Sequence, residues 1–181
     1  MVVLSMVSFA GLAKAERQYK GKYVPSKGWA KTVETAHLER GDTPKQQGGF
    51  RLVLVHENWE ELTEEEKATT YQRINMSGVL TGTVSLQTGK AAHVFVNKSR
   101  SGVMYSADDT LIPTAGDFLC FTGVPLTGVE EIKLIEGTGE YSGLVGGSIF
   151  VDGVVNMCPW HEDYRKNTFV VVPDQGYIEF N

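Results

Sequence analysis

Five glycines spaced through residues 135–147 constrain the fold of this chain more than any other feature. The stretch reads IEGTGEYSGLVGG, and Tyr141 stands alone among the glycines. The flanking segments, 130–135 and 148–155, carry the branched and aromatic side chains that are typical of β-strands. Glycine inside such a pattern marks a turn or a close approach of two backbones, so the stretch predicts a strand, turn, strand unit. We expect the ring of Tyr141 to lie across glycines of the neighbouring strand.

The same glycines do not indicate a phosphate-binding loop. A dinucleotide-binding motif has the spacing Gly-x-Gly-x-x-Gly and opens a helix. Here three residues separate Gly139 from Gly143, and the next segment is β-branched and ends at the turn pair Asp152-Gly153. The spacing therefore favours a structural hairpin, and we expect no cofactor.

Length and composition favour one all-β domain. The chain has 181 residues, of which 41% are hydrophobic, and its 20 glycines accompany only one convincing helical pattern. The formal net charge is −5, so no basic surface for nucleic acid is expected. The sequence also has no basic amphipathic stretch for an anionic membrane surface, so we expect no membrane partner. A homo-oligomer is compatible with the sequence.

The N-terminal residues resemble an export signal. Residues 2–13 form an apolar run too short to span a bilayer, and Ala13-Lys14-Ala15 supplies the small residues of a cleavage site. We therefore predict a signal peptide at 1–15, an extended lead-in at 16–30 and a β-barrel domain at 31–181, in a secreted or periplasmic protein. A buried N-terminal helix or strand is the alternative.

The chain has two cysteines, Cys120 and Cys158. In an oxidising compartment they could form a disulfide, which would stabilise the fold by about 4 kcal/mol on the chain-entropy estimate. Cys120 alternates with Phe118 and Thr122 in a strand-like run, so a buried free thiol is the alternative. The run from Cys158 to His161 offers only two metal ligands, so no metal site is expected.

Short strand patterns follow one another along the chain, with one helical exception. The predicted strands are 31–40, 50–56, 78–87, 91–97, 101–106, 117–123, the two arms of the glycine hairpin, 168–172 and 177–180. Turns are predicted at 108–109, 113–116 and 173–176. Thr63 to Glu66 form a capping box, which predicts a helix near 63–74. Roughly eight to ten short strands in one domain indicate a closed barrel or a sandwich.

The runs Gly116–Gly123 and Ile135–Gly146 resemble paired strands of the allene oxide cyclase-like and dirigent-like β-barrels, which belong to the calycin type. Those families repeatedly place Gly-Thr-Gly, an aromatic residue and two further glycines in this order. The resemblance implies a single antiparallel, eight-stranded, lipocalin-like closed barrel, and it implies no substrate. The segment 57–75 and the tail after Asn156 depart from the family pattern, and no catalytic residues are carried over.

A barrel of eight strands is just wide enough to be filled by side chains or to hold one small ligand. Alternation along 91–97 places His93, Phe95 and Asn97 on one face and Ala92, Val94 and Val96 on the other. The first three are the candidate ligand-binding residues, although parity alone does not identify the inner face. A second alternating face comprises Phe50, Leu52, Leu54 and His56. His56 and His93 are either ligand anchors and proton carriers or hydrogen-bonded core residues.

Three functions are compatible with these patterns. The first is a secreted barrel that binds a small, largely apolar molecule, because no catalytic constellation is visible. The second is a cyclase or isomerase of the allene oxide cyclase-like type, in which one or two polar groups in the cavity steer the reaction. The third is a filled barrel with a structural or protein-interaction role. The acidic residues between Glu57 and Glu66 indicate a solvated face near a helix start.

Overall fold

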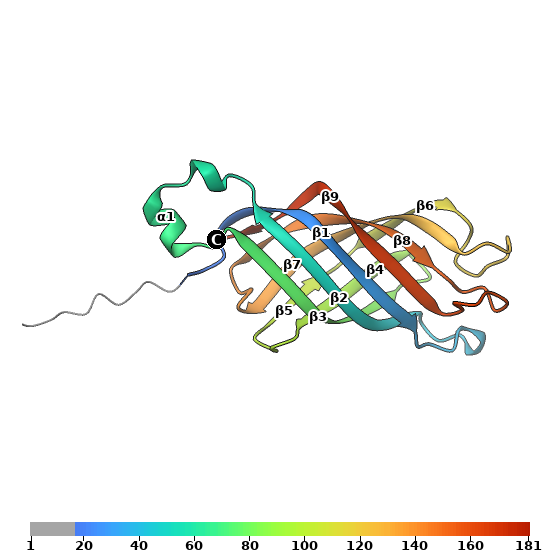
Figure 1. The fold of residues 1–181 in the computed structure, drawn as a ribbon. Coiled ribbons are helices and arrows are strands. Elements are labelled where there is room, and N and C mark those ends of the chain that lie inside the picture. The colour runs from blue at the N-terminus through green and yellow to red at the C-terminus, as the bar shows by residue number, and fades with distance from the viewer. Residues whose placement is uncertain (1–16) are drawn as a thin grey trace, which may run out of the picture.

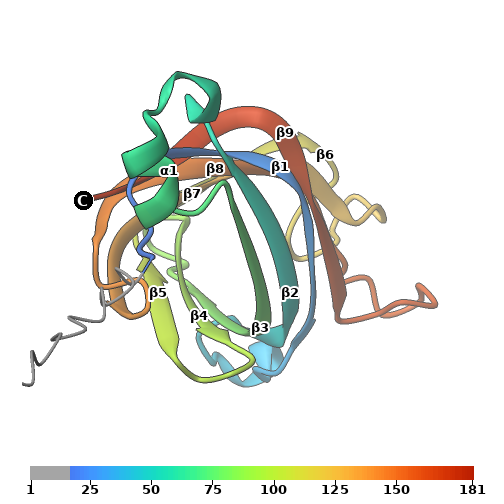
Figure 2. The same cartoon turned by 60° about the vertical axis from the view of Figure 1, so that its left-hand side comes forward.

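Antiparallel pairing of neighbouring strands closes one sheet into a barrel (Figures 1 and 2). The computed structural model describes residues 17–181, so the predicted signal peptide lies outside the described residues. The strands are β1 (Gly21–Glu34), β2 (Lys45–His56), β3 (Arg73–Val84), β4 (Lys90–Asn97), β5 (Gly102–Ser106), β6 (Asp109–Ala115), β7 (Leu126–Gly139), β8 (Leu144–Val155) and β9 (Lys166–Phe180). The one α-helix of this part of the chain is α1 (Glu64–Thr69), and short 3-10 turns cover Leu38–Arg40 and Trp59–Glu61.

The barrel has eight strand positions. The sheet order is β3-β2-β1-β9-β8-β7-β5-β4-β6, and β3 also pairs with β4, which closes the ring. β5 and β6 each pair with β4 on one side and β7 on the other, so they are two halves of one interrupted strand. The predicted all-β fold with a closed antiparallel eight-stranded barrel is therefore confirmed.

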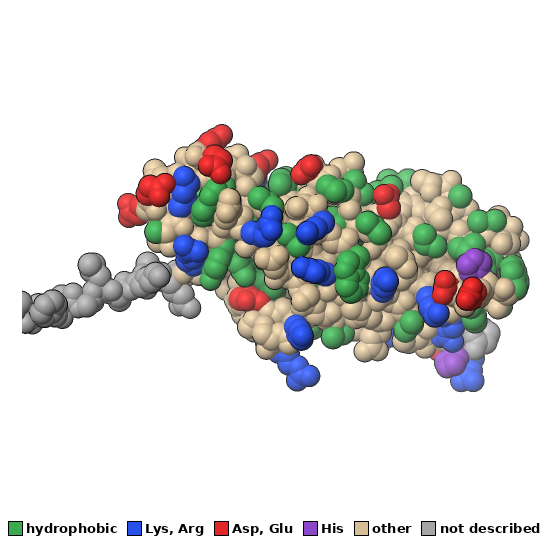
Figure 3. All heavy atoms as spheres, in the orientation of Figure 1, with side chains coloured by type: hydrophobic (Ala, Val, Ile, Leu, Met, Phe, Trp, Pro, Cys, Tyr) green, Lys and Arg blue, Asp and Glu red, His purple; other side chains and the backbone are tan. Residues whose placement is uncertain are grey.

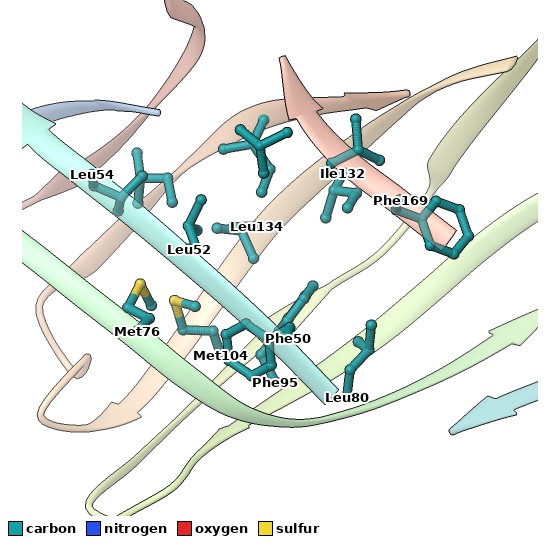
Figure 4. Packing of buried hydrophobic residues seen from close by; sticks show 14 of the residues in the cluster. Phe50, Leu52, Leu54, Met76, Leu80, Phe95, Met104, Ile132, Leu134 and Phe169 are labelled. Carbon is teal, nitrogen blue, oxygen red and sulfur yellow. The ribbon is translucent and has the colours of Figure 1, made fainter. Parts of the chain in front are cut away.

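Alternating side chains fill most of the interior. On β4, Ala91, His93, Phe95 and Asn97 are buried while the residues between them are half-exposed, which identifies the inner face that parity left open. The face of β2 with Phe50, Leu52, Leu54 and His56 also points inward. Figure 4 shows these apolar side chains meeting those of other strands across the barrel axis. Burial of this one face by every strand is what holds the barrel together.

The glycine hairpin is confirmed as two strands and a turn. β7 ends at Gly139, β8 begins at Leu144, and Tyr141 lies in the turn with only 2% of its surface exposed. A Cβ atom at Gly102 would lie 2.7 Å from Cδ2 of Tyr141, so the ring packs where β5 has no side chain. The predicted packing of the tyrosine on a neighbouring strand's glycine is therefore correct.

The helix is shorter than predicted. The capping box at Thr63 is present, since its hydroxyl accepts a hydrogen bond from the backbone of Glu66 and the Glu66 carboxylate accepts one from the backbone of Thr63. The helix ends at Thr69, because Ile74 belongs to β3, where it faces the core. Acidic side chains gather over this helix on the surface, as Figure 3 shows at the left of the view.

The barrel begins earlier than predicted. Residues 16–30 were expected to lie before the domain, but β1 starts at Gly21 and pairs with both β2 and β9. This strand contains Pro25 and Gly28, and its pairing shifts in register between Pro25 and Lys27 on the β2 side and between Tyr23 and Trp29 on the β9 side.

Four predictions about local structure, one strand and three turns, are wrong at least in part. Residues 117–123 form a turn-rich loop, and Cys120 has a positive φ of 61° there. The loop is favoured over a strand because the Asp117 carboxylate accepts hydrogen bonds from the backbone of Phe121 and Thr122. The predicted turns at 108–109 and 113–116 largely give way to β6, and 173–176 lies within β9, where Asp174 and Gly176 have positive φ.

The structure joins Cys120 to Cys158 in a disulfide with a Cα–Cα distance of 5.2 Å. The bond ties the β6–β7 loop to the β8–β9 loop. In the described part of the chain, no helix has the length and hydrophobicity that a membrane crossing requires.

The two ends of the barrel differ. We call one the closed end; it carries residues 17–20, α1 and the C-terminus, at the left of Figure 1. Its interior is filled by aromatic rings, among them Tyr19 stacked on Tyr141 at a centroid distance of 5.9 Å. We call the other the open end; it carries the loops 35–44, 85–89, 116–125 and 156–165.

Candidate functional site

The break between β5 and β6 directs two polar side chains into the barrel. A bulge shifts the pairing with β7 between Tyr105 and Ser106, and Asp108 has a positive φ of 56°. Ser106 and Asp109 are three residues apart and would face opposite sides of a regular strand. Because of the interruption both are buried, with exposed fractions of 4% and 0%.

Asp109 holds His93 in one orientation. The distance between His93 Nδ1 and Asp109 Oδ2 is 2.7 Å, and the Ser106 hydroxyl donates to the same carboxylate oxygen. The backbone N–H of Lys133 donates to the other carboxylate oxygen at 2.7 Å. Three donors thus satisfy the buried carboxylate, and the imidazole is oriented with Nε2 away from Asp109.

Room for the imidazole comes from Gly82, which faces His93 across the β3–β4 pair. A Cβ atom at Gly82 would lie 2.5 Å from Cδ2 of His93 and 2.8 Å from its Nε2. These distances are too short for a real contact, so only glycine allows the ring its present place.

Glu130 is the second buried carboxyl group and lacks the support that Asp109 has. It stands on the inner face of β7 between Gly128 and Ile132, and 5% of its surface is exposed. Its basic neighbour is His93, whose Nε2 lies 4.0 Å from Oε1, which is beyond hydrogen-bond distance. No described residue donates a hydrogen bond to its carboxyl group. Among the described residues no fully buried side-chain oxygen or nitrogen lacks a partner, so the Glu130 carboxyl group reaches the hollows that it lines.

The pKa values of Glu130 and His93 are both raised, for different reasons. Burial raises the pKa of Glu130, opposed by the charge of His93 and assisted by that of Asp109. Burial alone would lower the pKa of His93, but the hydrogen bond to Asp109 and the charges of Glu130 and Asp109 outweigh it, so the pKa is raised. Both shifts are toward the protonated forms, so each group keeps its proton to a higher pH than it would in water.

Glu130 and Phe169 stand between two hollows. The inner cavity, of about 40 Å³, has room for a few waters at most and is lined chiefly by Phe50, Leu52, Leu80, His93, Phe95, Glu130, Ile132, Phe169 and Val171. The mouth pocket, of about 280 Å³ at the open end, is lined chiefly by Gln46, Val84, Leu86, Ala91, Leu111, Pro113, Phe118, Leu126, Glu130, Val155 and Phe169. The mouth pocket is near the lower limit for small-molecule sites, and Glu130 is its one ionisable lining residue.

The three predicted ligand-binding residues separate in the structure. His93 and Phe95 line the inner cavity, but Asn97 lines neither hollow. Asn97 donates hydrogen bonds to Ser101 and Glu140 and accepts one from the backbone of Gly102, so it fixes the turns of the closed end. Binding by these residues stays a prediction, and the geometry favours only the first two.

His56 packs as a core residue at the closed end. Its ring contacts Tyr23 edge-on at 5.0 Å, and its Nδ1 accepts a hydrogen bond from the backbone of Asn58. Burial lowers the pKa of His56, which favours the neutral ring. Of the two roles that the sequence left open for His56, the structure favours that of a hydrogen-bonded core residue.

The residues that could hold a metal ion are His93, Asp109 and Glu130, whose ligand atoms lie within 4.8 Å of one another. Two ligands of one tetrahedral ion at 2.0–2.2 Å are separated by about 3.4 Å. The 2.7 Å contact between His93 and Asp109 is shorter and is a hydrogen bond. The geometry therefore fits a hydrogen-bonded cluster better than a metal centre.

Sequence reasoning missed Ser106, Asp109 and Glu130. Glu130 had a readable signal, since it is the one carboxyl residue on the alternating face Leu126, Gly128, Glu130, Ile132 and Leu134. Asp109 had no such signal, because its inward direction depends on the bulge and on pairing with distant strands.

Larger hollows lie outside the barrel. The largest, of about 750 Å³, includes the buried Asn156 and Asn167, but these bond to each other, to His161 and to Thr32. Another, of about 410 Å³, covers the closed end beside Tyr19. Neither contains a buried ionisable group without a hydrogen bond, so the mouth pocket is the better candidate site.

Comparisons of this chain with protein-family models, with curated proteins and with solved structures found no match.

Proposed function

We propose that this protein binds a small, largely apolar molecule in the mouth pocket, with Glu130 as the polar anchor at its floor. The observation that carries the proposal is the buried carboxyl group of Glu130, which accepts no hydrogen bond from a described residue and borders a largely apolar hollow. Burying such a group costs free energy that a ligand can recover by pairing with it.

The proposal includes secretion. The apolar N-terminal run and the Cys120–Cys158 disulfide support it, since disulfides persist in oxidising compartments. The proposal also keeps the kinship with allene oxide cyclase-like and dirigent-like barrels, which the closed eight-stranded fold supports as an architecture.

Native mass spectrometry of the protein purified without denaturation tests for a retained small molecule. Two variants of adjacent residues on β4 test whether the retained molecule lies in the mouth pocket. Ala91 lines the mouth pocket and Ala92 faces outward, so Ala91→Phe should abolish retention and Ala92→Phe should preserve it. Equal retention by the two folded variants would place the ligand elsewhere and contradict the proposal.

A cyclase or isomerase is the second candidate. The observation that favours it is the oriented imidazole of His93, which faces Glu130 and could move a proton to or from it. An enzyme would convert the retained molecule into an isomer of equal mass, seen as a new chromatographic peak. His93→Gln should then stop conversion while reducing binding far less. The absence of conversion by the wild-type protein would exclude this candidate.

A further inference from the structure

Glu130 and His93 converge on one point in the inner cavity. Their atoms Oε1 and Nε2 are 4.0 Å apart, and both side chains line the cavity. If an oxygen atom lay about 2.8 Å from both Oε1 and Nε2, the angle between the two contacts at that oxygen would be about 90°. This angle is acceptable for two hydrogen bonds. A metal ion about 2.1 Å from each would instead lie almost on the line between them, far from tetrahedral geometry.

Both groups can act as donors toward that point. His93 gives its Nδ1 proton to the anionic Asp109, so the Nε2 of the imidazolium is a second donor. Glu130 is buried in apolar surroundings that favour its neutral acid, which also carries a proton. These three are the buried ionisable groups near the point, contributed by β4, β6 and β7. Arg51 also borders the inner cavity but is exposed on β2, and the side chain of Lys133 is partly exposed near Glu131.

The choice of ligand atom follows from the charges. An amine would meet the positive charge of the imidazolium, and a carboxylate would add a second buried negative charge next to Asp109. A carbonyl oxygen is neutral and has two lone pairs for two donors. The inner cavity of about 40 Å³ is large enough for this group but not for a carbon skeleton. Glu130 and Phe169 line both hollows, so the mouth pocket is the adjoining space for the skeleton.

We infer that the point between Glu130 and His93 receives the carbonyl oxygen of a small, neutral, apolar ketone or aldehyde whose skeleton lies in the mouth pocket. The inference rests on the proposed function and specifies its ligand class. Two donors on one carbonyl oxygen draw electrons toward that oxygen and weaken the C=O bond.

The test is a binding series on the purified full chain with one eight-carbon skeleton that ends in a ketone, an alcohol, an amine, a carboxylate or no polar group. Calorimetry should find the ketone tightest, by about tenfold over the alcohol. The infrared stretch of a ¹³C-labelled ketone should move to lower frequency on binding, because the two donors weaken the bond.

Two substitutions separate donation from packing. Glu130→Gln keeps an N–H donor and should retain most of the ketone affinity and the infrared shift. Glu130→Leu removes the donor and should lose about tenfold in affinity and part of the shift. Should the leucine variant fail to fold, the infrared shift and the ranking of the series on the wild type decide the question.

The outcomes separate the inference from the proposed function. Tighter binding of the amine or the carboxylate than of the ketone, or a bound ketone without an infrared shift, would overturn the carbonyl site and leave the binding function standing. Failure of every member of the series, the alkane included, to bind would count against both.

Discussion

The closed and open ends of the barrel are formed by the same strands, but their interiors are packed differently. At the closed end Tyr19, Tyr23, Tyr141 and Phe180 pack ring against ring. At the open end apolar side chains surround the mouth pocket, and its floor is the buried, unpaired Glu130. Filling a barrel with aromatic rings contributes stability, whereas a hollow and an unpaired acid cost it. The difference teaches that, in the described part of the chain, the closed end contributes packing and the open end contributes a hollow that borders a buried acid.

The largest expected effect is at the closed end. Tyr141→Ala removes a ring that is 2% exposed and packs on Gly102 and Tyr19, so we expect a loss of about 3–5 kcal/mol in the free energy of unfolding. Urea denaturation measures it. Tyr164→Ala, at a residue 40% exposed near the open end, is the control and should cost little. Similar losses for both would remove the distinction between the ends.

The disulfide of the open end comes next. Cys120→Ser with Cys158→Ser should lower stability by about 2–4 kcal/mol, because the bond closes a long loop in the unfolded chain. It should also weaken ligand binding, since Phe118 of the tethered loop lines the mouth pocket. Urea denaturation with and without reductant is the measurement, and an unchanged midpoint would mean that the bond is not formed in solution.

Gly82→Ala tests the packing of His93, which with Asp109 and Glu130 forms the polar cluster towards the open end. The new methyl group would collide with the His93 ring, so we expect a loss of about 1–3 kcal/mol and a changed imidazole NMR signal. Gly49→Ala is the matched control in β2, because its nearest neighbour atom would be 3.6 Å away. If the control cost as much as Gly82→Ala, the loss would come from the strand backbone and not from His93.

The smallest expected effect is a pH dependence. The pKa values of Glu130 and His93 are raised in the folded protein above the ordinary 4.5 and 6.5. The folded state therefore holds protons more tightly than the unfolded state, and stability is full below the ordinary values and falls as pH rises through the raised ones. Glu130→Gln should remove the Glu130 part of this fall in urea denaturation across pH. A stability that rises over that range would show that Glu130 is ionised.

Local patterns predicted an all-β domain that is a closed barrel or a sandwich, and the resemblance to known β-barrel families led to the prediction of eight strands in a closed barrel. Period-two alternation on 91–97 and the glycines around Tyr141 both depend on neighbours in sequence, and both were interpreted correctly. The segment 117–123 has a strand-like composition, but side-chain hydrogen bonds from Asp117 to nearby backbone groups bend it into a loop. Amino-acid composition alone does not show that these hydrogen bonds compete with strand pairing.

The candidate site was predictable only in part. His93 and Phe95 followed from alternation on one strand. Asp109 and Ser106 did not, because a bulge in an interrupted strand turns them inward and their partners lie on other strands. The site depends on pairing between distant segments, for which a single sequence carries little signal.

A crystal structure of the full chain soaked with the eight-carbon ketone tests the central claim most directly. The account predicts electron density for the carbon skeleton in the mouth pocket, with its oxygen within hydrogen-bond distance of Glu130. Density for the ketone only in a hollow outside the barrel, or a mouth pocket closed by its own side chains, would contradict it.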